Sequence, residues 1–496
     1  MGKVKKVIVI GIDGATWRLL DPWIKEGSLP NFARIVKEGA STPLLSTIPP
    51  MTAPSWISFS TGKNPGRHGV FDFYQRINNK RQVLDSLAIK SNEIWRLLSK
   101  ARKKVIVINP PLSYPVRKVN GYLIAGMMTP SYEVNYTYPS NLKSKLKKWG
   151  YQIGVELDPG MRSNWARSYV MSRDKKKRQT LIDFFNQIAE KRWETFKKLA
   201  GRNDWQFAFV LFEGTDRLQH YYWQKNGLYV IKSHYLALDR ILGECLELID
   251  KKGVLFVISD HGFSEIKKKF YINNFLAHHG CLKKKKGNIL TQLTLGKGKE
   301  IILNLSKLGF PQEKILTNRW IFKFYQKLYR PNIVFEKSRA FMLNETSRGI
   351  WIDYQDEKDY ERTRDFIIKR LKNLRDPKTS RRIVRAFKRE EIYQGPYVRE
   401  APDILLMTYP GYSLEVVVEE KDLSQKAFLE PTSLGERNAD HEREGILMVA
   451  GLGVKKAKRR AAKGSPEIID IAPTILNLLG VHIPADMDGK VLKEFC

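Results

Sequence analysis

The chain has 496 residues, of which 42% are hydrophobic, 11% aromatic and 28% charged, and this composition excludes a disordered, collagen-like or disulfide-scaffold protein. Its 86 Lys and Arg residues against 52 Asp and Glu residues give a formal net charge of +34, which favours anionic partners such as nucleic acid, acidic lipid headgroups or phosphorylated substrates. A lysine-rich, ion-paired surface of the thermophilic type explains the same charge equally well.

The three cysteines, Cys245, Cys281 and Cys496, have no metal-finger spacing, which indicates a reducing compartment. The apolar stretch at residues 7–10 is too short for the core of a signal peptide. The sequence has no apolar run of about 18 residues or more, so we expect no membrane-spanning helix. We therefore predict a cytoplasmic protein.

Short apolar runs alternate with helical periodicity along much of the chain. Three of the runs end in acidic residues at turns, which is typical of buried parallel strands that lead into helices. The predicted strands are residues 4–13, 105–109, 207–213, 254–260 and 445–450, and the predicted helices are 29–38, 93–100, 179–199 and 233–249. This order predicts an α/β fold with an open, doubly wound, mostly parallel sheet and helices on both faces. In such a fold, ligands bind beyond the carboxyl ends of the strands.

Two segments interrupt this alternation. Residues 127–177 are rich in Tyr, Ser, Lys and Pro and are predicted to be an inserted loop or cap. Residues 267–399 carry most of the basic clusters and are predicted to be a second, basic cap, whose helix at 360–374 has a solvated charged face. The sheet pattern is expected to resume at 402–407. The predicted core is therefore discontinuous and comprises residues 1–126, 178–266 and 400–496.

The acidic residues at the strand ends lie close in sequence to several of the eight histidines. Asp216 and His220 are four residues apart and would share one helix face, although a solvated helix face gives the same spacing. Asp260 and His261 end a strand before Gly262, where Asp260 could simply cap the turn. With Asp13 and His441, three Asp and three His residues make two metal sites of three ligands each, and these ligand types suit zinc or manganese.

A hydroxyl nucleophile is available at Thr52, which precedes Ala53, Pro54 and Ser55. This pattern predicts a helix N-cap with a proline in the first turn, and capping alone would account for it. A hydroxyl at a helix N-terminus also lies where backbone N–H groups favour an anion, so a threonine alkoxide there could attack phosphorus.

These motifs, in this order and with these local spacings, resemble the alkaline phosphatase superfamily. Within it, the chain is similar to the type I phosphodiesterase/nucleotide pyrophosphatase branch, and in particular to a prokaryotic group of predicted phosphohydrolases or phosphomutases. The similarity lies in the Gly-Ile-Asp-Gly of residues 11–14, the segment from Thr52 through 61–69, the Asp-His-Gly-Phe of 260–263 and residues 470–480. The inserted middle of the chain is not part of it.

The resemblance implies that Asp216, His220 and His441 hold one divalent metal ion, and that Asp13, Asp260 and His261 hold a second one together with Thr52. It implies zinc in preference to manganese, and hydrolysis through a covalent phosphothreonine on Thr52. The implied substrate is a phosphorylated small molecule or a nucleotide-like compound, attacked at a phosphodiester or pyrophosphate bond.

The sequence departs from the branch at one place. Nucleotide pyrophosphatases of this branch have an asparagine after the His-Gly of the nucleophile segment, where it helps to hold a non-bridging phosphate oxygen. This chain reads His68-Gly-Val-Phe-Asp-Phe73, with phenylalanine at that place. The substitutes that the sequence offers are Asn109, Lys268, Arg217 and Arg67, with no ranking among them.

Three other functions are compatible with parts of the pattern. A phosphoryl-transferring mutase of the same superfamily would have serine as its nucleophile, so Thr52 argues mildly against it. A sulfatase would need a Cys/Ser-x-Pro-x-Arg segment, which residues 52–56 lack. A non-catalytic binder of anionic surfaces or nucleic acid would use the charge of +34 on a degenerate scaffold, and its binding would weaken steeply with salt.

Overall fold

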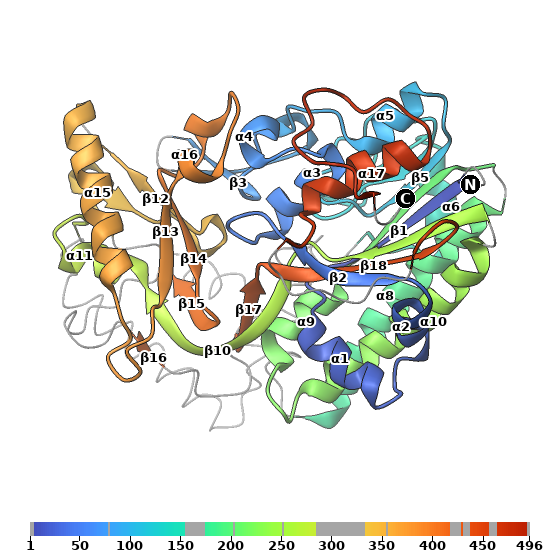
Figure 1. The fold of residues 1–496 in the computed structure, drawn as a ribbon, viewed down its shortest axis with the longest axis horizontal. Helices are drawn as coiled ribbons and strands as arrows, with labels where there is room; N and C mark the ends of the chain where they lie inside the picture. Colours follow the sequence, from blue (N-terminus) through green and yellow to red (C-terminus); the bar gives the residue numbers. More distant parts are fainter. Residues whose placement is uncertain are drawn as a thin grey trace.

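The computed structural model describes residues 4–77, 80–153, 174–201, 204–249, 252–283, 333–353, 356–416, 428–429, 437–455 and 464–493. These residues form a larger lobe around an eight-stranded sheet and a smaller lobe built on two further sheets (Figure 1). The long strand β10 (Gly262–Tyr271) runs from the larger lobe into the smaller one. No helix of the described residues is both long and apolar enough to cross a membrane.

The eight-stranded sheet has the order β2-β18-β9-β1-β8-β5-β6-β7. The five central strands, from β9 to β6, are parallel, whereas β18 and β7 run antiparallel to their neighbours. The strands are β1 (Lys6–Ile12), β2 (Ala40–Leu45), β5 (Val105–Ile108), β6 (Gly121–Ile124), β7 (Thr137–Tyr138), β8 (Phe207–Phe212), β9 (Gly253–Ile258) and β18 (Glu444–Gly451). The predicted mostly parallel α/β sheet is thereby confirmed.

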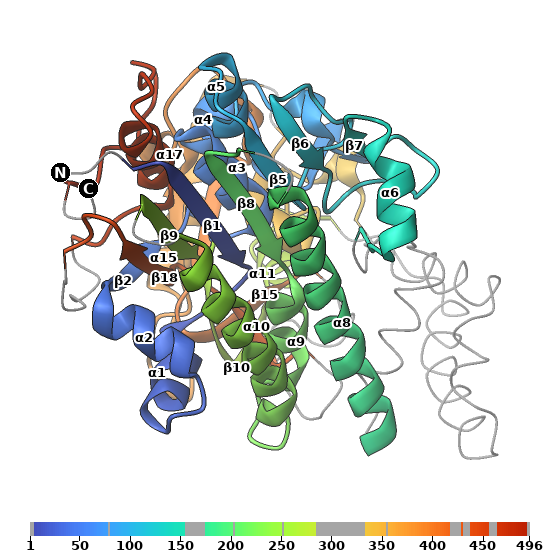
Figure 2. The same ribbon diagram turned by 90° about the vertical axis from the view of Figure 1, so that its right-hand side faces the viewer.

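Helices cover both faces of this sheet, as Figure 2 shows from the side. One face packs against α1 (Trp17–Lys25), α2 (Pro30–Glu38), α6 (Leu142–Trp149), α8 (Lys175–Ala200), α9 (Gly214–Tyr222) and α10 (Leu228–Ile249). The other face packs against α3 (Thr52–Thr61), α5 (Ile94–Lys100) and α17 (Ile471–Leu478). The short α4 (Pro65–His68) follows α3, and a hairpin of β3 (Tyr74–Ile77) and β4 (Lys80–Val83) follows α4.

The apolar runs predicted as strands are continuous because both faces of the sheet are buried. In β1, Ile8, Ile10 and Ile12 contact the core beneath α8 and α10, whereas Val7 and Val9 contact the core beneath α3 and α17. Side chains alternate between the faces of a strand, so a strand covered on both sides is apolar at every position. The predicted helices at 29–38, 93–100, 179–199 and 233–249 are present, with ends that differ by up to five residues.

The smaller lobe combines two sheets with the helices α11 and α15 over a separate apolar core, and it also contains the short α16. One sheet has the order β15-β10-β16, with β17 also paired to β10, and the other has the order β11-β12-β14-β13. Its elements are α11 (Ile272–His278), β11 (Ala340–Phe341), β12 (Gly349–Ile352), α15 (Glu357–Asn373), β13 (Val384–Lys388), α16 (Arg389–Ile392), β14 (Ile404–Thr408), β15 (Gly411–Glu415), β16 (Phe428–Leu429) and β17 (Ala439–Glu442).

The prediction that residues 402–407 return to the main sheet is wrong. β14 pairs with β12 and β13 in the smaller lobe, and β15 pairs with β10. A buried apolar run identifies a strand but not the sheet that it joins, because that depends on pairings between distant segments. The segment predicted as core at 400–496 therefore begins inside the smaller lobe, whereas β7, from the predicted insertion at 127–177, extends the main sheet. The domain boundaries otherwise stay a prediction.

The α3 side of the sheet is held by a cluster of aromatic rings around Phe209. The rings of Trp56, Phe59 and Trp95 lie 5.2–6.0 Å from that of Phe209, measured between centroids. All four side chains are buried. The helix that begins at Thr52 is therefore fixed to the central strands by packing.

We expect Phe209→Ala to lower the free energy of unfolding by about 3–5 kcal/mol, because it removes a buried ring and leaves a cavity among three others. The control Phe366→Ala removes a ring that is 37% exposed on α15 and should cost much less. Urea denaturation followed by tryptophan fluorescence measures both. Equal losses in the two variants would contradict the role given to this cluster.

Candidate metal centre

Acidic residues follow the carboxyl ends of three neighbouring central strands. Asp13 comes directly after β1, Asp260 follows β9, and Asp216 lies in the first turn of α9, which begins just after β8. β1 lies between β8 and β9 in the sheet. The three carboxylates therefore meet at one edge of the sheet, the place where a doubly wound fold binds its ligands.

The three histidines reach the same place from different elements. His220 is four residues after Asp216 on α9, and His261 lies in the turn between β9 and β10. His441 lies on β17, opposite Phe263 of β10. Because Asp260 and His261 occupy a turn and not a strand, the expected alternation of faces does not apply to them, and both side chains point to the cluster.

The six side chains form two trios. In the first trio, Asp216 Oδ1 lies 3.1 Å from His441 Nε2 and 3.4 Å from His220 Nε2, and the two Nε2 atoms are 3.2 Å apart. In the second trio, His261 Nε2 lies 3.5 Å from Asp13 Oδ1 and 3.2 Å from Asp260 Oδ2. Ligands bonded to one tetrahedral zinc ion are themselves about 3.2–3.6 Å apart. The distances given for the two trios, 3.1–3.5 Å, are close to this spacing.

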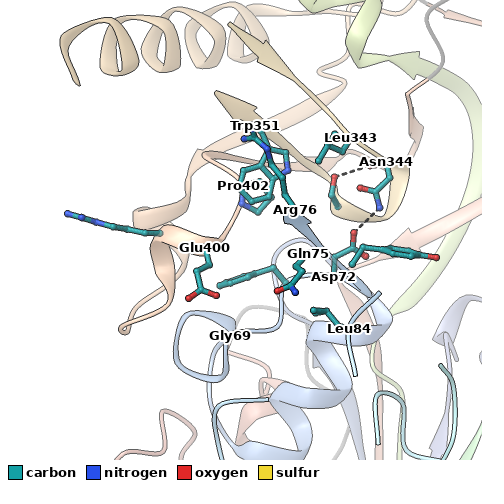
Figure 3. A pocket seen from close by; sticks show the side chains of 14 residues that line it. Gly69, Asp72, Gln75, Arg76, Leu84, Leu343, Asn344, Trp351, Glu400 and Pro402 are labelled. Carbon is teal, nitrogen blue, oxygen red and sulfur yellow. Dashed lines mark hydrogen bonds between the residues drawn. The ribbon is translucent and has the colours of Figure 1, made fainter. Parts of the chain in front are cut away.

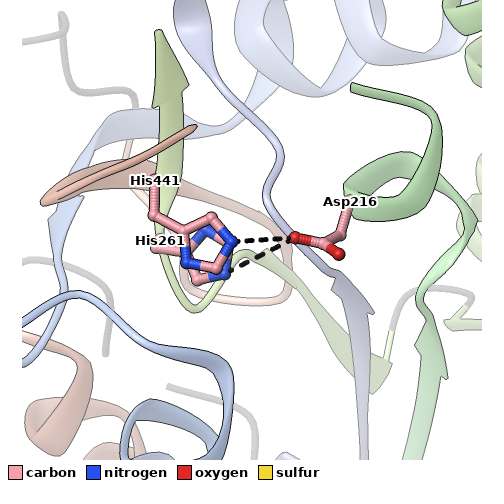
Figure 4. A group of neighbouring side chains, drawn as sticks. All are labelled: Asp216, His261 and His441. Atoms are coloured by element: carbon pink, nitrogen blue, oxygen red, sulfur yellow. Dashed lines mark hydrogen bonds and ion pairs between the residues drawn. The ribbon is translucent and has the colours of Figure 1, made fainter. Parts of the chain in front are cut away.

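The two trios are adjacent. His261 Nε2 lies 4.0 Å from Asp216 Oδ1, and the rings of His261 and His441 stack with their centroids 3.6 Å apart. Figure 4 shows the Asp216 carboxylate directed at both rings. One cluster of Asp and His side chains therefore spans the positions predicted for two metal ions.

The hydroxyl of Thr52 lies at the edge of the second trio, with Oγ1 3.3 Å from His261 Nε2. Thr52 is the first residue of α3, and the N-cap is Met51, which makes no side-chain capping bond. The N-cap predicted for Thr52 is therefore one residue out, and its hydroxyl points to the cluster instead of closing the helix end. Trp56, one turn further along α3, donates from Nε1 to Asp13 Oδ2 at 3.2 Å.

The electrostatics of the cluster fit a pair of bound cations. Burial raises the pKa of Asp13, and the Asp260 and Asp216 carboxylates raise it further; burial also raises the pKa of Asp260. Asp13 Oδ1 and Asp260 Oδ2 are buried and accept no hydrogen bond. Buried carboxylate oxygens of this kind are costly unless a cation compensates them. The residues present therefore fit the divalent ions that the resemblance implies.

Two of the three histidines, His441 and His261, are in the form that binds metals. Burial lowers the pKa of His441 to about 4 and lowers that of His261 as well, so both rings are neutral near pH 7. Burial would raise the pKa of Asp216, but its interactions with His220 and His441 outweigh this and keep the pKa below its usual value. Each ring also directs Nδ1 at a backbone carbonyl, 2.9–3.2 Å away, which leaves Nε2 for the cluster.

Gly14 brings the backbone against the second trio. Its N–H donates to Asp260 Oδ1 at 3.1 Å, and its φ of +71° lies in the left-handed region. A Cβ on Gly14 would lie 2.5 Å from the Phe263 ring. Glycine is therefore required at this turn, which places Asp13 and orients Asp260.

A buried ion pair fixes the start of α9. Arg192, from α8, is 1% exposed and donates to both carboxylate oxygens of Glu213, the residue before α9. Asn109 Nδ2 donates to the same carboxylate at 2.8 Å. This network was not predicted from the sequence, where Glu213 counts only as an acidic residue at a strand end. It holds the helix turn that carries Asp216.

The four predicted substrate contacts have different surroundings. Arg217 is half-buried and lowers the pKa of Asp13 by its charge, so it is electrostatically coupled to the cluster. Asn109 is bonded to Glu213, Lys268 is paired with Asp376 at 2.9 Å, and Arg67 is paired with Asp488 at 2.8 Å. Among the contacts of the described residues, none joins Asn109, Lys268 or Arg67 to the Asp and His cluster.

Two further residues that the sequence analysis missed lie against the first trio. Asp440 precedes His441 and accepts hydrogen bonds from Arg348 and Arg437, and Arg437 also contacts His220. The only sequence signal is the pair Asp440-His441, which repeats the pattern of Asp260-His261. Asp440 is thus the counter-ion of two arginines, and it also forms with His220 and His441 a third group of side chains with metal-ligand spacing.

A cavity of about 620 Å³ lies at the seam between the lobes (Figure 3). Asp72 accepts hydrogen bonds there from Asn344 and Thr346, and Arg76 lies over the ring of Trp351. The polar groups of its walls are thus bonded across the seam. These contacts join the segment after α4 to the smaller lobe. Phe73, at the place of the missing asparagine, packs against apolar core.

The sequence profile described as "Type I phosphodiesterase / nucleotide pyrophosphatase" matches residues 7–430. No curated protein matches the chain in sequence. Among solved structures, a phosphonoacetate hydrolase from Sinorhizobium meliloti in complex with phosphonoformate has a TM-score of 0.58 at 16% identity, with 97% of this chain and 96% of that chain covered.

Two other solved structures share the fold. The alkaline phosphatase PafA has a TM-score of 0.53 at 16% identity, with 100% of this chain and 99% of the PafA chain covered. An inactive variant of murine ectonucleotide pyrophosphatase/phosphodiesterase 5 in complex with AMP has a TM-score of 0.51 at 13% identity, with 97% and 96% covered. At these identities the structures establish a common fold with this chain.

We expect Glu213→Gln to lower the free energy of unfolding by about 3–5 kcal/mol, because it leaves the guanidinium of Arg192 buried without a counter-charge. The control Glu190→Gln breaks an exposed pair with Arg240 on the neighbouring helices and should cost less than about 1 kcal/mol. Differential scanning calorimetry of the two variants measures the difference. A Glu213→Gln protein that melts with the control would show that the pair does not hold α9.

Proposed function

The chain belongs to the type I phosphodiesterase/nucleotide pyrophosphatase family, and from this we propose that it is a phosphohydrolase that uses two divalent metal ions and acts on phosphodiester or pyrophosphate bonds. The observation that carries the proposal is the convergence of three aspartates, three histidines and the Thr52 hydroxyl on one buried cluster. These residues come from distant parts of the chain, and packing alone gives no reason to bury three carboxylates together.

The proposed ligand sets follow the two trios. Asp216, His220 and His441 would hold one ion, and Asp13, Asp260 and His261 would hold the other beside Thr52. Carboxylate and imidazole ligands at this spacing suit zinc, with manganese as the alternative. Two divalent ions bound there would lower the pKa of the Thr52 hydroxyl and stabilise charge on the attacking and leaving oxygens.

The proposed reaction has two displacements at phosphorus. Thr52 Oγ1 attacks in line, its proton passes to water, and the bond from phosphorus to the leaving oxygen breaks as a phosphothreonine forms. Water then attacks the phosphothreonine on the opposite face and frees the hydroxyl. Each displacement inverts the configuration at phosphorus, so the product retains it. The packing of α3 against the central strands keeps Oγ1 fixed between the two steps.

The proposed substrate is a phosphorylated small molecule or a nucleotide-like compound. The AMP complex of the murine pyrophosphatase supports a nucleotide-like substrate, and the phosphonoacetate hydrolase shows that the same fold accepts small phosphonates. We place the protein in the cytoplasm, since the two described cysteines, Cys245 and Cys281, are free thiols. A mutase would return the phosphoryl group to an acceptor other than water, so product analysis separates the two activities.

We expect Thr52→Ala to lower the turnover of an aryl phosphodiester more than about a thousandfold, because the attacking atom is gone. Bound metal should stay near two equivalents by elemental analysis, since the six Asp and His ligands remain. Thr52→Ser keeps a hydroxyl at the same place and serves as the control, with measurable turnover retained. Unchanged turnover in Thr52→Ala would remove Thr52 from the mechanism.

We expect His441→Ala to lose one metal ion in preference to the other, because His441 belongs to the first trio only. Elemental analysis after dialysis should give about one equivalent in His441→Ala and about two in the wild type. His482→Ala is the control, since His482 lies in the segment after α17 and contacts neither trio. A full complement of metal in His441→Ala would show that His441 is not a ligand.

A further inference from the structure

The guanidinium of Arg437 lies directly on one of the proposed metal ligands. Its Nε is 2.9 Å from His220 Nδ1, and its Nη2 is 3.3 Å from His220 Nε2. The side chain is 27% exposed, so it can be reached from solvent.

Arg437 is held in this position by a buried counter-ion. Asp440 is 5% exposed, and its Oδ1 accepts hydrogen bonds from Arg437 Nη2 at 2.9 Å and from Arg348 Nη2. Arg348 comes from the smaller lobe and is itself 3% exposed. The charges of Arg348 and Arg437 outweigh burial and keep the pKa of Asp440 below its usual range. The arginine is therefore anchored by Asp440 while part of its side chain stays exposed.

The hydrogen bonds of His220 conflict with those of Arg437 once His220 acts as a ligand. His220 Nδ1 lies 2.9 Å from the carbonyl oxygen of Ala439, which can only accept, so Nδ1 carries the proton when Nε2 binds a metal ion. Neither ring nitrogen then has a lone pair for an arginine. The N–H groups that Arg437 directs at His220 are left without an acceptor, beside the metal centre.

The charges around the cluster also favour a bound anion, which would supply the hydrogen-bond acceptor that Arg437 lacks. Three ligand carboxylates balance all but one of the positive charges of two divalent ions, and Arg437 lies near the carboxylates of Glu345 and Glu415 as well as that of Asp440. The six ligands with two ions bound therefore keep one positive charge before a substrate arrives, and this charge attracts an anion. Guanidinium is the side chain best suited to phosphate oxygens, which it binds with two parallel hydrogen bonds.

We propose that Arg437 binds a non-bridging oxygen of the substrate's phosphoryl group at the His220 side of the cluster, in place of the asparagine that this chain lacks. This inference rests on the proposed function and goes beyond it by including phosphate monoesters among the substrates. Arg437 favours substrates with a second negative charge at or next to the reacting phosphorus, as in pyrophosphates and terminal phosphates, over simple diesters. Asp440 and Arg348 act as positioning residues for its guanidinium.

The first test is the binding of inorganic phosphate to the metal-loaded protein by isothermal titration calorimetry. Arg437→Ala should weaken the phosphate Kd by about 10- to 100-fold, the range of a hydrogen bond between charged groups, and should keep both metal ions. Arg437→Lys should recover part of the affinity. The control Arg34→Ala removes the same charge from an exposed pair on α2 and should leave the Kd unchanged.

The second test compares kcat/KM for an aryl phosphate monoester with that for an aryl phosphodiester. Arg437→Ala should lose at least tenfold more on the dianionic monoester than on the monoanionic diester. An equal loss on both esters, loss of metal in Arg437→Ala, or a wild-type protein that does not bind phosphate would each overturn the proposal. If the wild type turns over neither ester, the hydrolase assignment fails, and the calorimetric result still decides the role of Arg437.

Discussion

The burial of three carboxylates within a few ångströms of one another is the constraint on which the rest of the site depends. Asp13 and Asp260 each keep one buried oxygen without a hydrogen bond, and burial together with the neighbouring carboxylates raises their pKa values. Such an arrangement persists in a stable fold when bound cations compensate it. With the three histidines, of which His261 and His441 are neutral, these carboxylates form a set of side chains that fits two divalent ions.

The fold brings the ligands together by its topology and then fixes them with contacts that are not themselves part of the chemistry. Adjacent parallel strands supply the acidic residues, and β17, from the opposite end of the chain, supplies His441. Glu213 and Arg192 hold the first turn of α9, and the aromatic cluster around Phe209 holds α3. Arg348 links the smaller lobe to the centre through Asp440. The basic insertion predicted at residues 267–399 thus places at least one positive charge, that of Arg348, next to the site.

The sequence predicted the main sheet and pointed to the Asp and His residues that the structure brings together, because both depend on local patterns: apolar runs, acidic residues at their ends and short Asp/His spacings. The assignment of residues 402–407 to the main sheet was wrong, since strand pairing depends on distant partners. Thr52 was predicted to be the N-cap but is the first residue of α3. A difference of one residue at a helix end is smaller than sequence patterns can resolve. Arg437, Asp440 and Arg192 were missed because their roles arise only when elements far apart in the chain pack together. The roles of the ligands remain predictions.

The central claim is that the two trios hold two divalent ions at once. The most direct measurement is an anomalous difference map from crystals grown with zinc. The account predicts two peaks, one among Asp216, His220 and His441 and one among Asp13, Asp260 and His261, with Thr52 Oγ1 nearest the second. A single peak, or peaks away from these six side chains, would contradict it.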